Sequence, residues 1–162
     1  MGQSHLLRQC FRYTVQLMHN QCDEMTTEES LLQPPFAANC MNWLIGHIIS
    51  SRQRILQLVG EQLIWDDATR ARYRFNSSPI TALEEGVLSL DTLLSALDAT
   101  QEGIERGLAK LSEADLNAPS AGSGKDTTLA ERLVYFHFHE AHHAGQIVTM
   151  GEFAGKKGAW LQ

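Results

Sequence analysis

The sequence predicts an all-α protein, a four-helix bundle formed by one domain that spans residues 1–162. Four segments carry apolar residues at steps of three and four, which is the spacing of a helix with one buried face. No segment of strand length alternates apolar and polar residues. Hydrophobic residues make up 43% of the chain and charged residues 20%, a composition typical of globular domains with a packed core.

The first two predicted helices lie in the N-terminal third of the chain. The apolar stripe of the first runs from Leu7 to Met18. The second is expected to follow Pro34-Pro35, because proline suits the first turn of a helix. Its apolar positions extend from Met41 to Val59, and Gly60 is a stop signal.

The third and fourth predicted helices have clear N-terminal signals. The third starts after Ser89, a predicted N-cap, and its apolar stripe covers residues 90–111. The fourth opens with Thr128 and Glu131, which have the spacing of a capping box, and ends near Gly151.

The connections between these helices differ in length. The joins within the first pair and within the last pair are moderate and suit antiparallel neighbours. About 28 residues, from Gly60 to Leu88, connect the second helix to the third. This join is much longer than usual between bundle neighbours and predicts a crossover that makes helices two and three parallel. A short helix is expected within it, over residues 82–87.

The charge and the cysteine pattern limit the possible functions. The net charge is −6 and no run of lysine or arginine occurs, so nucleic acid is not an expected partner. No window is apolar enough to span a membrane, and the N-terminus has no secretory apolar region. The three cysteines Cys10, Cys22 and Cys40 lack CxxC spacing. We therefore expect a cytoplasmic protein with reduced thiols that does not engage membranes.

Four of the seven histidines fall between residues 137 and 143, on the fourth predicted helix. His139 and His143 are separated by about 40° around the helix axis and one turn along it, so both rings can reach one metal ion. Gln146 projects on the same side, and Arg132 and Phe136 lie in this sector toward the N-terminus. The alternative is that the pair is incidental on a histidine-rich helix, because two imidazoles alone make a weak metal site.

Residues 139–143 also match HExxH, the zinc-protease pattern in which the glutamate is the general base. Only 19 residues follow His143, and among them only Glu152 could be a third ligand. The longer pattern of related proteases needs glycine and histidine where Gln146 and Thr149 stand. No strand is evident that could bind a peptide by its edge. The protease interpretation is therefore disfavoured.

A third ligand is better sought on an earlier helix. His47 lies in the middle of the second predicted helix among apolar residues, so its ring must face the bundle interior or its margin. The alternative is a core histidine with one hydrogen-bonded nitrogen. His5 and His19 lie near the ends of the first helix, and His137 and His142 point away from the paired rings.

Two stretches, NWLIGHI and HEAHHAGQIVTMGEFAGKKG, resemble the DinB/YfiT-like family, the DinB superfamily of metal-binding four-helix-bundle proteins. In that family a histidine in a Trp-x-x-x-His-Ile context on the second helix joins an H-x-x-x-H pair on the last. The resemblance implies metal ligands at His47, His139 and His143, with Gly145-Gln146 in the expected place. Family members often carry arginine where this chain has Ala144, so a role of that arginine in anion binding is not carried over.

The resemblance also implies an up-down-down-up bundle, a bound nickel or zinc ion and a homodimer. Three tryptophans also favour a homodimer, because a partner subunit could cover their large apolar side chains: Trp43, Trp65 and Trp160. Similar proteins are thiol S-transferases, a thiol-dependent isomerase and metal-dependent hydrolases. The resemblance thus implies a small-molecule substrate, with a low-molecular-weight thiol as one candidate.

Three neutral imidazoles leave a coordination position open, which is typical of catalytic rather than structural metal sites. We expect a metal-dependent enzyme that carries out thiol S-transfer or hydrolysis. The alternative is a non-enzymatic metal-binding or stress-response protein. Candidate partners for the ligands or the substrate are Glu140, Gln146, Arg132 and Asn42. The pocket is expected where the long join passes helices two and four, and its polar residues are candidate contacts or a solvated charge run: Trp65, Asp66, Asp67, Arg70 and Arg72.

Overall fold

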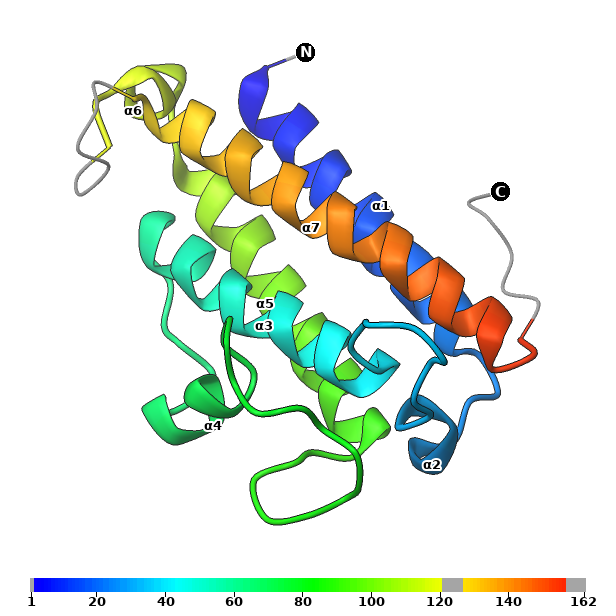
Figure 1. Ribbon diagram of the computed structural model, residues 1–162. Coiled ribbons are helices and arrows are strands. Elements are labelled where there is room, and N and C mark those ends of the chain that lie inside the picture. Colours follow the sequence, from blue (N-terminus) through cyan, green and yellow to red (C-terminus); the bar gives the residue numbers. More distant parts are fainter. Residues whose placement is uncertain (1, 121–126, 157–162) are drawn as a thin grey trace.

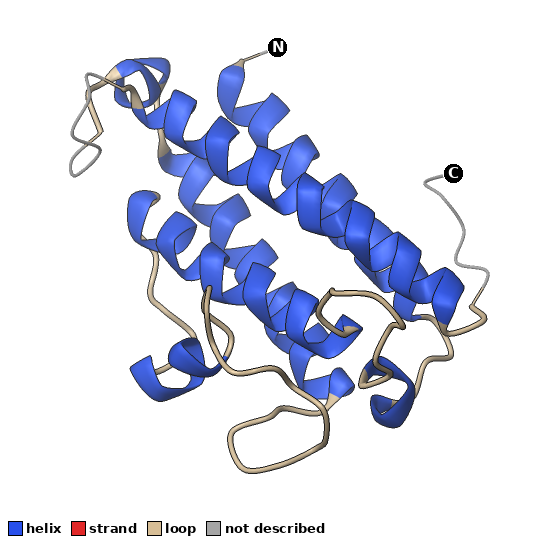
Figure 2. Cartoon of the chain, in the orientation of Figure 1, coloured by secondary structure: helices blue, strands red, loops and turns tan. Residues whose placement is uncertain are grey.

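The computed structural model describes residues 2–120 and 127–156. This part of the chain is helical and contains no strand, only an isolated bridge between Pro119 and Thr128 (Figure 2). Four long helices form the bundle: α1 (Gln3–Cys22), α3 (Met41–Leu58), α5 (Leu90–Lys110) and α7 (Leu129–Phe153). Three short helices lie in the connections: α2 (Thr27–Ser30), α4 (Asp67–Arg72) and α6 (Glu113–Asn117).

Side-chain contacts between helices fix the direction of each. Along α3 and α7 the contact partners run in opposite order, because His47 meets His143 and Arg52 meets Glu140. Along α3 and α5 they run in the same order, because Leu56 packs on Gly103 and Val59 packs on Gly107. Helices α3 and α5 are therefore parallel, as the length of the join predicted, and α7 is antiparallel to α3.

Helix α1 completes the arrangement. It is antiparallel to α5, since Arg12 pairs with Glu105 and His19 with Asp98. It is parallel to α7, since Phe11 contacts His137 and Gln21 lies against Gly151. The bundle is thus up-down-down-up (Figure 1). The sequence predicted that helices one and two, and helices three and four, are antiparallel neighbours. They are antiparallel, but they are not neighbours, because α1 and α3, and likewise α5 and α7, lie diagonally across the bundle.

The helix starts that depend on local capping were predicted correctly. Ser89 accepts a hydrogen bond from the backbone N–H of Thr92 at the start of α5. Thr128 and Glu131 form the predicted capping box of α7. The start of α3 was predicted wrongly, because the helix begins at Met41 and the two prolines lie in the preceding loop. Tertiary contacts hold this loop, since Gln33 and Cys40 both donate to the backbone oxygen of Ile80.

The helix expected over residues 82–87 is not formed. The helical turn of this join is α4, which Asp66 caps by accepting from the N–H of Thr69. The guanidinium of Arg72 donates to the backbone oxygens of Ser78 and Pro79 and pairs with Glu84. These contacts hold residues 78–84 in an irregular path along the end of α4.

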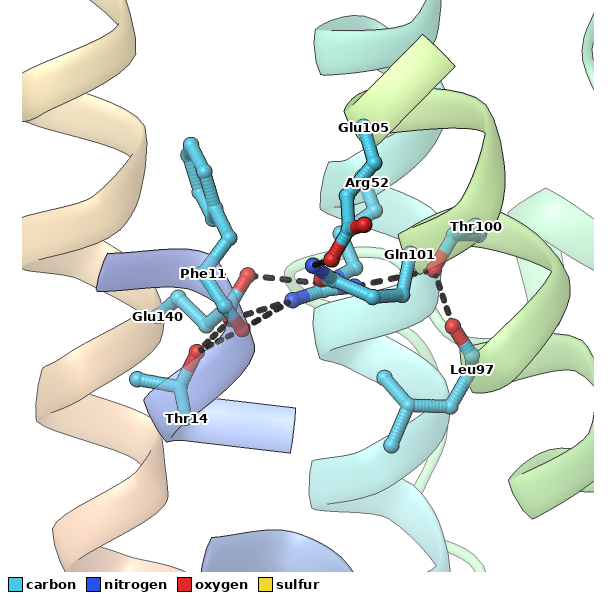
Figure 3. Close-up of polar contacts among 8 residues, drawn as sticks. All are labelled: Phe11, Thr14, Arg52, Leu97, Thr100, Gln101, Glu105 and Glu140. Atoms are coloured by element: carbon cyan, nitrogen blue, oxygen red, sulfur yellow. Dashed lines mark hydrogen bonds and ion pairs between the residues drawn. The ribbon is translucent and has the colours of Figure 1, made fainter. Parts of the chain in front are cut away.

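The core consists of two apolar clusters with a polar layer between them. One cluster surrounds Ile45, Ile48 and Ile49 of α3, and the other surrounds Ile55 and Leu56 one to two turns later. Between them Arg52 is fully buried (0% exposed) and Glu140 almost so (2%). Figure 3 shows the guanidinium between Glu140 on one side and the α5 side chains on the other.

All five N–H donors of Arg52 have acceptors. Nε and Nη2 donate to the two carboxylate oxygens of Glu140, at 2.8 and 2.7 Å. Nη1 donates to Thr100 and Gln101, and Nη2 also donates to the backbone oxygen of Phe11. A buried ion pair is costly to desolvate unless its remaining hydrogen bonds are made. Here they are, and the layer connects all four long helices.

Candidate metal centre

Three histidines meet where α3 packs against α7. His47 comes from the second turn of α3, and His139 and His143 come from successive turns of α7. The Nε2 atom of His139 lies 3.4 Å from Nε2 of His47 and 3.2 Å from Nε2 of His143. One ring nitrogen from each residue lies within 4.8 Å of the others, so the three form a group that can hold a metal ion.

The spacing of these nitrogens suits a first-row divalent ion. Two imidazole nitrogens on a tetrahedral zinc ion, each about 2.0–2.1 Å from it, are about 3.3 Å apart. The two Nε2–Nε2 distances lie close to this value. The three residues that the sequence singled out are thus brought together, and no other histidine, cysteine or carboxylate of the described residues joins the group.

The orientation of His47 is set by two neighbours. Its Nδ1 lies 2.9 Å from the backbone oxygen of Tyr73, which can only accept, so Nδ1 carries the proton and Nε2 keeps its lone pair. The ring of Trp43 stacks on the imidazole at 4.6 Å with an interplanar angle of 8°. Tyr73 reaches this position because Gly46 has no side chain; a Cβ there would lie 2.0 Å from the tyrosine ring.

The two histidines of α7 differ in their support. Nδ1 of His143 lies 2.7 Å from Oε1 of Gln146, so the predicted partner is in place. Nδ1 of His139 is buried and has no hydrogen-bond partner among the described residues. Asn42, another candidate, bonds instead to the hydroxyl of Tyr73 and to the backbone oxygen of Leu88. It therefore holds Tyr73, and through it His47.

Burial keeps the three imidazoles uncharged at neutral pH. Desolvation is the main cause that lowers the pKa of His47 and of His139, and it lowers the pKa of His143 from 6.5 to about 4. The hydrogen bond to Tyr73 partly opposes the shift at His47. A neutral imidazole is the form that binds a metal ion, so the ligands are ready without losing protons.

Glu140 does not support the metal ligands. One position along a helix rotates a side chain by about 100°, so Glu140 points into the core while His139 faces α3. Its carboxylate is held by Arg52 and also accepts from the hydroxyl of Thr14. The HExxH protease interpretation fails for the same reason, because the glutamate that would activate water is enclosed between the helices.

Arg132 is likewise not brought to the histidines. It lies about 10 Å along α7 from His139, and its guanidinium donates to the hydroxyl of Ser120. His142, interpreted from the sequence as a surface residue, is exposed and lies beside the group, with its ring 5.1 Å from that of His143.

The three histidines line one wall of a cavity of about 970 Å³ between α3, α4 and α7. From the long join, Asp67 and Arg70 line it as expected. The other candidates from that segment do not: Asp66 caps α4, Arg72 pairs with Glu84, and Trp65 packs on the core. Phe136, which the sequence placed in the sector of the two histidines of α7, also lines the cavity. Further lining residues had not been identified from the sequence as part of the site: Trp43, Arg54, Arg74, Phe75 and Tyr135.

Two of these residues had a signal in the sequence. Trp43 precedes His47 by one helical turn, and Arg54 follows it by two, so all three share one face of α3. The backbone oxygen of Tyr73 had none, because its approach to His47 depends on the path of the long join.

The fold and the site define a class, an up-down-down-up helical bundle with a three-histidine group suited to a divalent metal ion. The sequence model of the DinB superfamily matches residues 7–147, and the chain belongs to this superfamily. Among solved structures it is similar to a conserved protein from Enterococcus faecalis. The TM-score is 0.77 and the identity 18%, with 96% of this chain and 99% of the other covered. No curated protein matches the chain.

Proposed function

We propose that this protein is a metal-dependent enzyme that carries out thiol S-transfer or hydrolysis on a small molecule. One observation carries the proposal: three neutral imidazoles converge at the wall of a large cavity, and the described residues supply no fourth ligand. A structural zinc site is normally closed by four protein ligands, whereas a catalytic site keeps a position open.

His47, His139 and His143 would hold the ion. A divalent ion bound in this way supplies a Lewis acid with a free position, at which a thiol or water loses its proton more readily. The surrounding residues then have defined tasks. Tyr73 and Gln146 fix the rings of His47 and His143 through Nδ1, so that Nε2 of each faces the cavity.

We propose zinc or nickel as the bound ion, since imidazole nitrogen suits both and the family resemblance implies them. Cys10, Cys22 and Cys40 are free, as expected, and no helix of the described ranges is long and apolar enough to cross a membrane. A cytoplasmic location, where low-molecular-weight thiols are abundant, is part of the proposal.

We expect His143→Ala to weaken metal binding by more than about 100-fold, since even loss of a residue that only supports a ligand costs 10–100-fold. The protein is purified without a metal-affinity column, and its zinc and nickel contents are measured by mass spectrometry. His142→Ala is the matched control, because it removes a neighbouring imidazole that is not in the group. Equal metal loss in both variants would contradict the assignment.

Activity is then tested with a panel of thiol conjugations to electrophiles and of ester hydrolyses. We expect turnover by wild-type protein that a chelator abolishes, that added zinc or nickel restores, and that His143→Ala lacks. Circular dichroism verifies that this variant folds. Metal bound by the protein without turnover across the panel would favour the non-enzymatic, metal-binding or stress-response role.

We also propose that the protein is a homodimer. The tryptophans are weak support, because Trp43 is buried, Trp65 packs on the core, and Trp160 lies outside the described residues. Stronger support comes from the outer face of α7, where Val134 and Phe138 are 57% and 71% exposed. Light scattering at micromolar concentration is expected to give about twice the monomer mass of 18.1 kDa. A monomer mass would refute the dimer.

A further inference from the structure

The cavity beside the three histidines is positively charged, although the chain has a net charge of −6. Three arginines line it, Arg54, Arg70 and Arg74, and the carboxylate among the lining residues is that of Asp67. With neutral imidazoles, three positive charges and one negative charge leave a net charge of +2. A divalent ion in the group would add two more.

An anion in the cavity would offset this positive charge. Guanidinium groups that share a cavity with a metal cation repel it, and the repulsion is stronger in a partly enclosed site than in water. An anion placed between them reverses the sign of both interactions. The charge pattern therefore fits a ligand that brings negative charge into the cavity.

The three arginines are positioned by the same elements that hold His47. Arg54 lies two turns after His47 on the same face of α3, about 10 Å along the axis. Arg74 directly follows Tyr73, whose backbone oxygen accepts from His47. Arg70 lies in α4, which is tied to α3 where Ser50 donates to the backbone oxygen of Arg70.

The guanidinium groups of these three arginines can still donate hydrogen bonds to a ligand. Neither Arg54 nor Arg74 forms an ion pair with any residue in the described ranges. Arg70 pairs with Asp67, a carboxylate that is 99% exposed, and its Nε has no hydrogen-bond partner there. The neighbouring Arg72 is different, because its donors are taken by backbone oxygens and Glu84. The three arginines that line the cavity therefore differ from Arg72, whose contacts hold the loop after α4.

We propose that the cavity contains an anion subsite formed by Arg54, Arg70 and Arg74, and that the substrate is a small organic anion. Its carboxylate or phosphonate-like group lies against the arginines, and its reacting atom lies toward the three histidines. Phe75 and Tyr135 line the cavity with 75% and 65% of their surfaces exposed, and their rings can cover the organic body of the ligand. This inference rests on the proposed function, because it names the substrate class of the same site.

Phenylphosphonate is a suitable probe, and benzyl alcohol is its neutral counterpart. Calorimetric titration of zinc-loaded and metal-free protein at pH 7 is expected to show binding of phenylphosphonate and none of benzyl alcohol. Arg54→Gln and Arg74→Gln should each weaken phenylphosphonate binding about tenfold, as expected for loss of a hydrogen bond to a charged group. Arg106→Gln is the matched control, because this exposed arginine of α5 lies outside the cavity and its removal changes the net charge equally.

The coupling between metal and anion gives a second readout. By linkage, phenylphosphonate should tighten zinc binding by the factor by which zinc tightens phenylphosphonate binding. The double variant Arg54→Gln/Arg74→Gln should weaken this coupling. Without the anion it should bind zinc at least as tightly as wild-type protein, because two repelling charges are gone.

The outcomes separate this inference from the proposed function. Phenylphosphonate binding that is absent, or equal in wild-type protein and both arginine variants, overturns the anion subsite even if zinc binds and turnover is found. If wild-type protein binds neither zinc nor nickel, the proposed function fails. The comparison of the metal-free proteins then still decides whether the arginines form an anion subsite.

Discussion

Glu140→Ala is expected to lower the free energy of unfolding by about 3–5 kcal/mol, because it leaves the guanidinium of Arg52 buried without its counter-ion. Arg52 is 0% exposed, so water cannot replace the lost carboxylate without opening the bundle. The hydroxyl of Thr14 would keep only the backbone oxygen of Phe11 as its acceptor. Denaturant unfolding followed by circular dichroism measures the change.

Two comparisons make this prediction specific. Glu102→Ala removes a carboxylate from an exposed pair with Arg106 on α5 and should cost no more than about 1 kcal/mol. The double variant Arg52→Met/Glu140→Leu replaces the pair by apolar side chains and should be more stable than Glu140→Ala alone. Similar losses for Glu140→Ala and Glu102→Ala would show that the polar layer does not stabilise the bundle.

Gly46→Ala should destabilise the protein by about 1–3 kcal/mol, which is the usual cost of an overpacked core. The added Cβ would stand 2.0 Å from the ring of Tyr73. The tyrosine must shift, and His47 then loses the backbone oxygen that orients its Nδ1. We therefore also expect zinc affinity to fall about 10–100-fold, the range for loss of a hydrogen bond that supports a metal ligand. Thermal unfolding and competitive zinc titration measure the two effects.

Gly145→Ala is the matched control. It is the same substitution within a long helix, but no atom lies within 4 Å of the added Cβ. Alanine is the better helix former, so this variant should be more stable by about 0.5–1 kcal/mol. The two substitutions are therefore expected to have opposite signs. A gain in stability for Gly46→Ala would mean that Tyr73 does not need the close approach.

The sequence alone determined features that depend on neighbouring residues. The capping residues Ser89 and Thr128 start α5 and α7 where predicted, because a cap needs only the next three residues. His139 and His143 can bind one ion because they are four residues apart, about one helical turn, and so lie on the same side of α7. The length of the join after α3 predicted the parallel run of α3 and α5. The apolar surroundings of His47 made it a candidate third ligand, but only the resemblance favoured it over a core histidine, since spacing within one helix says nothing of another.

The tertiary structure decided where these local features meet. It alone showed that Glu140 faces Arg52 in the core instead of the metal ligands. It also brought Tyr73 to His47, and placed Arg54 and Arg74 around one cavity. Residues far apart in the chain interact only after the bundle has fixed the packing and rotation of its helices. That packing is a sum of many contacts along all four helices, so no single stretch of the sequence encodes it.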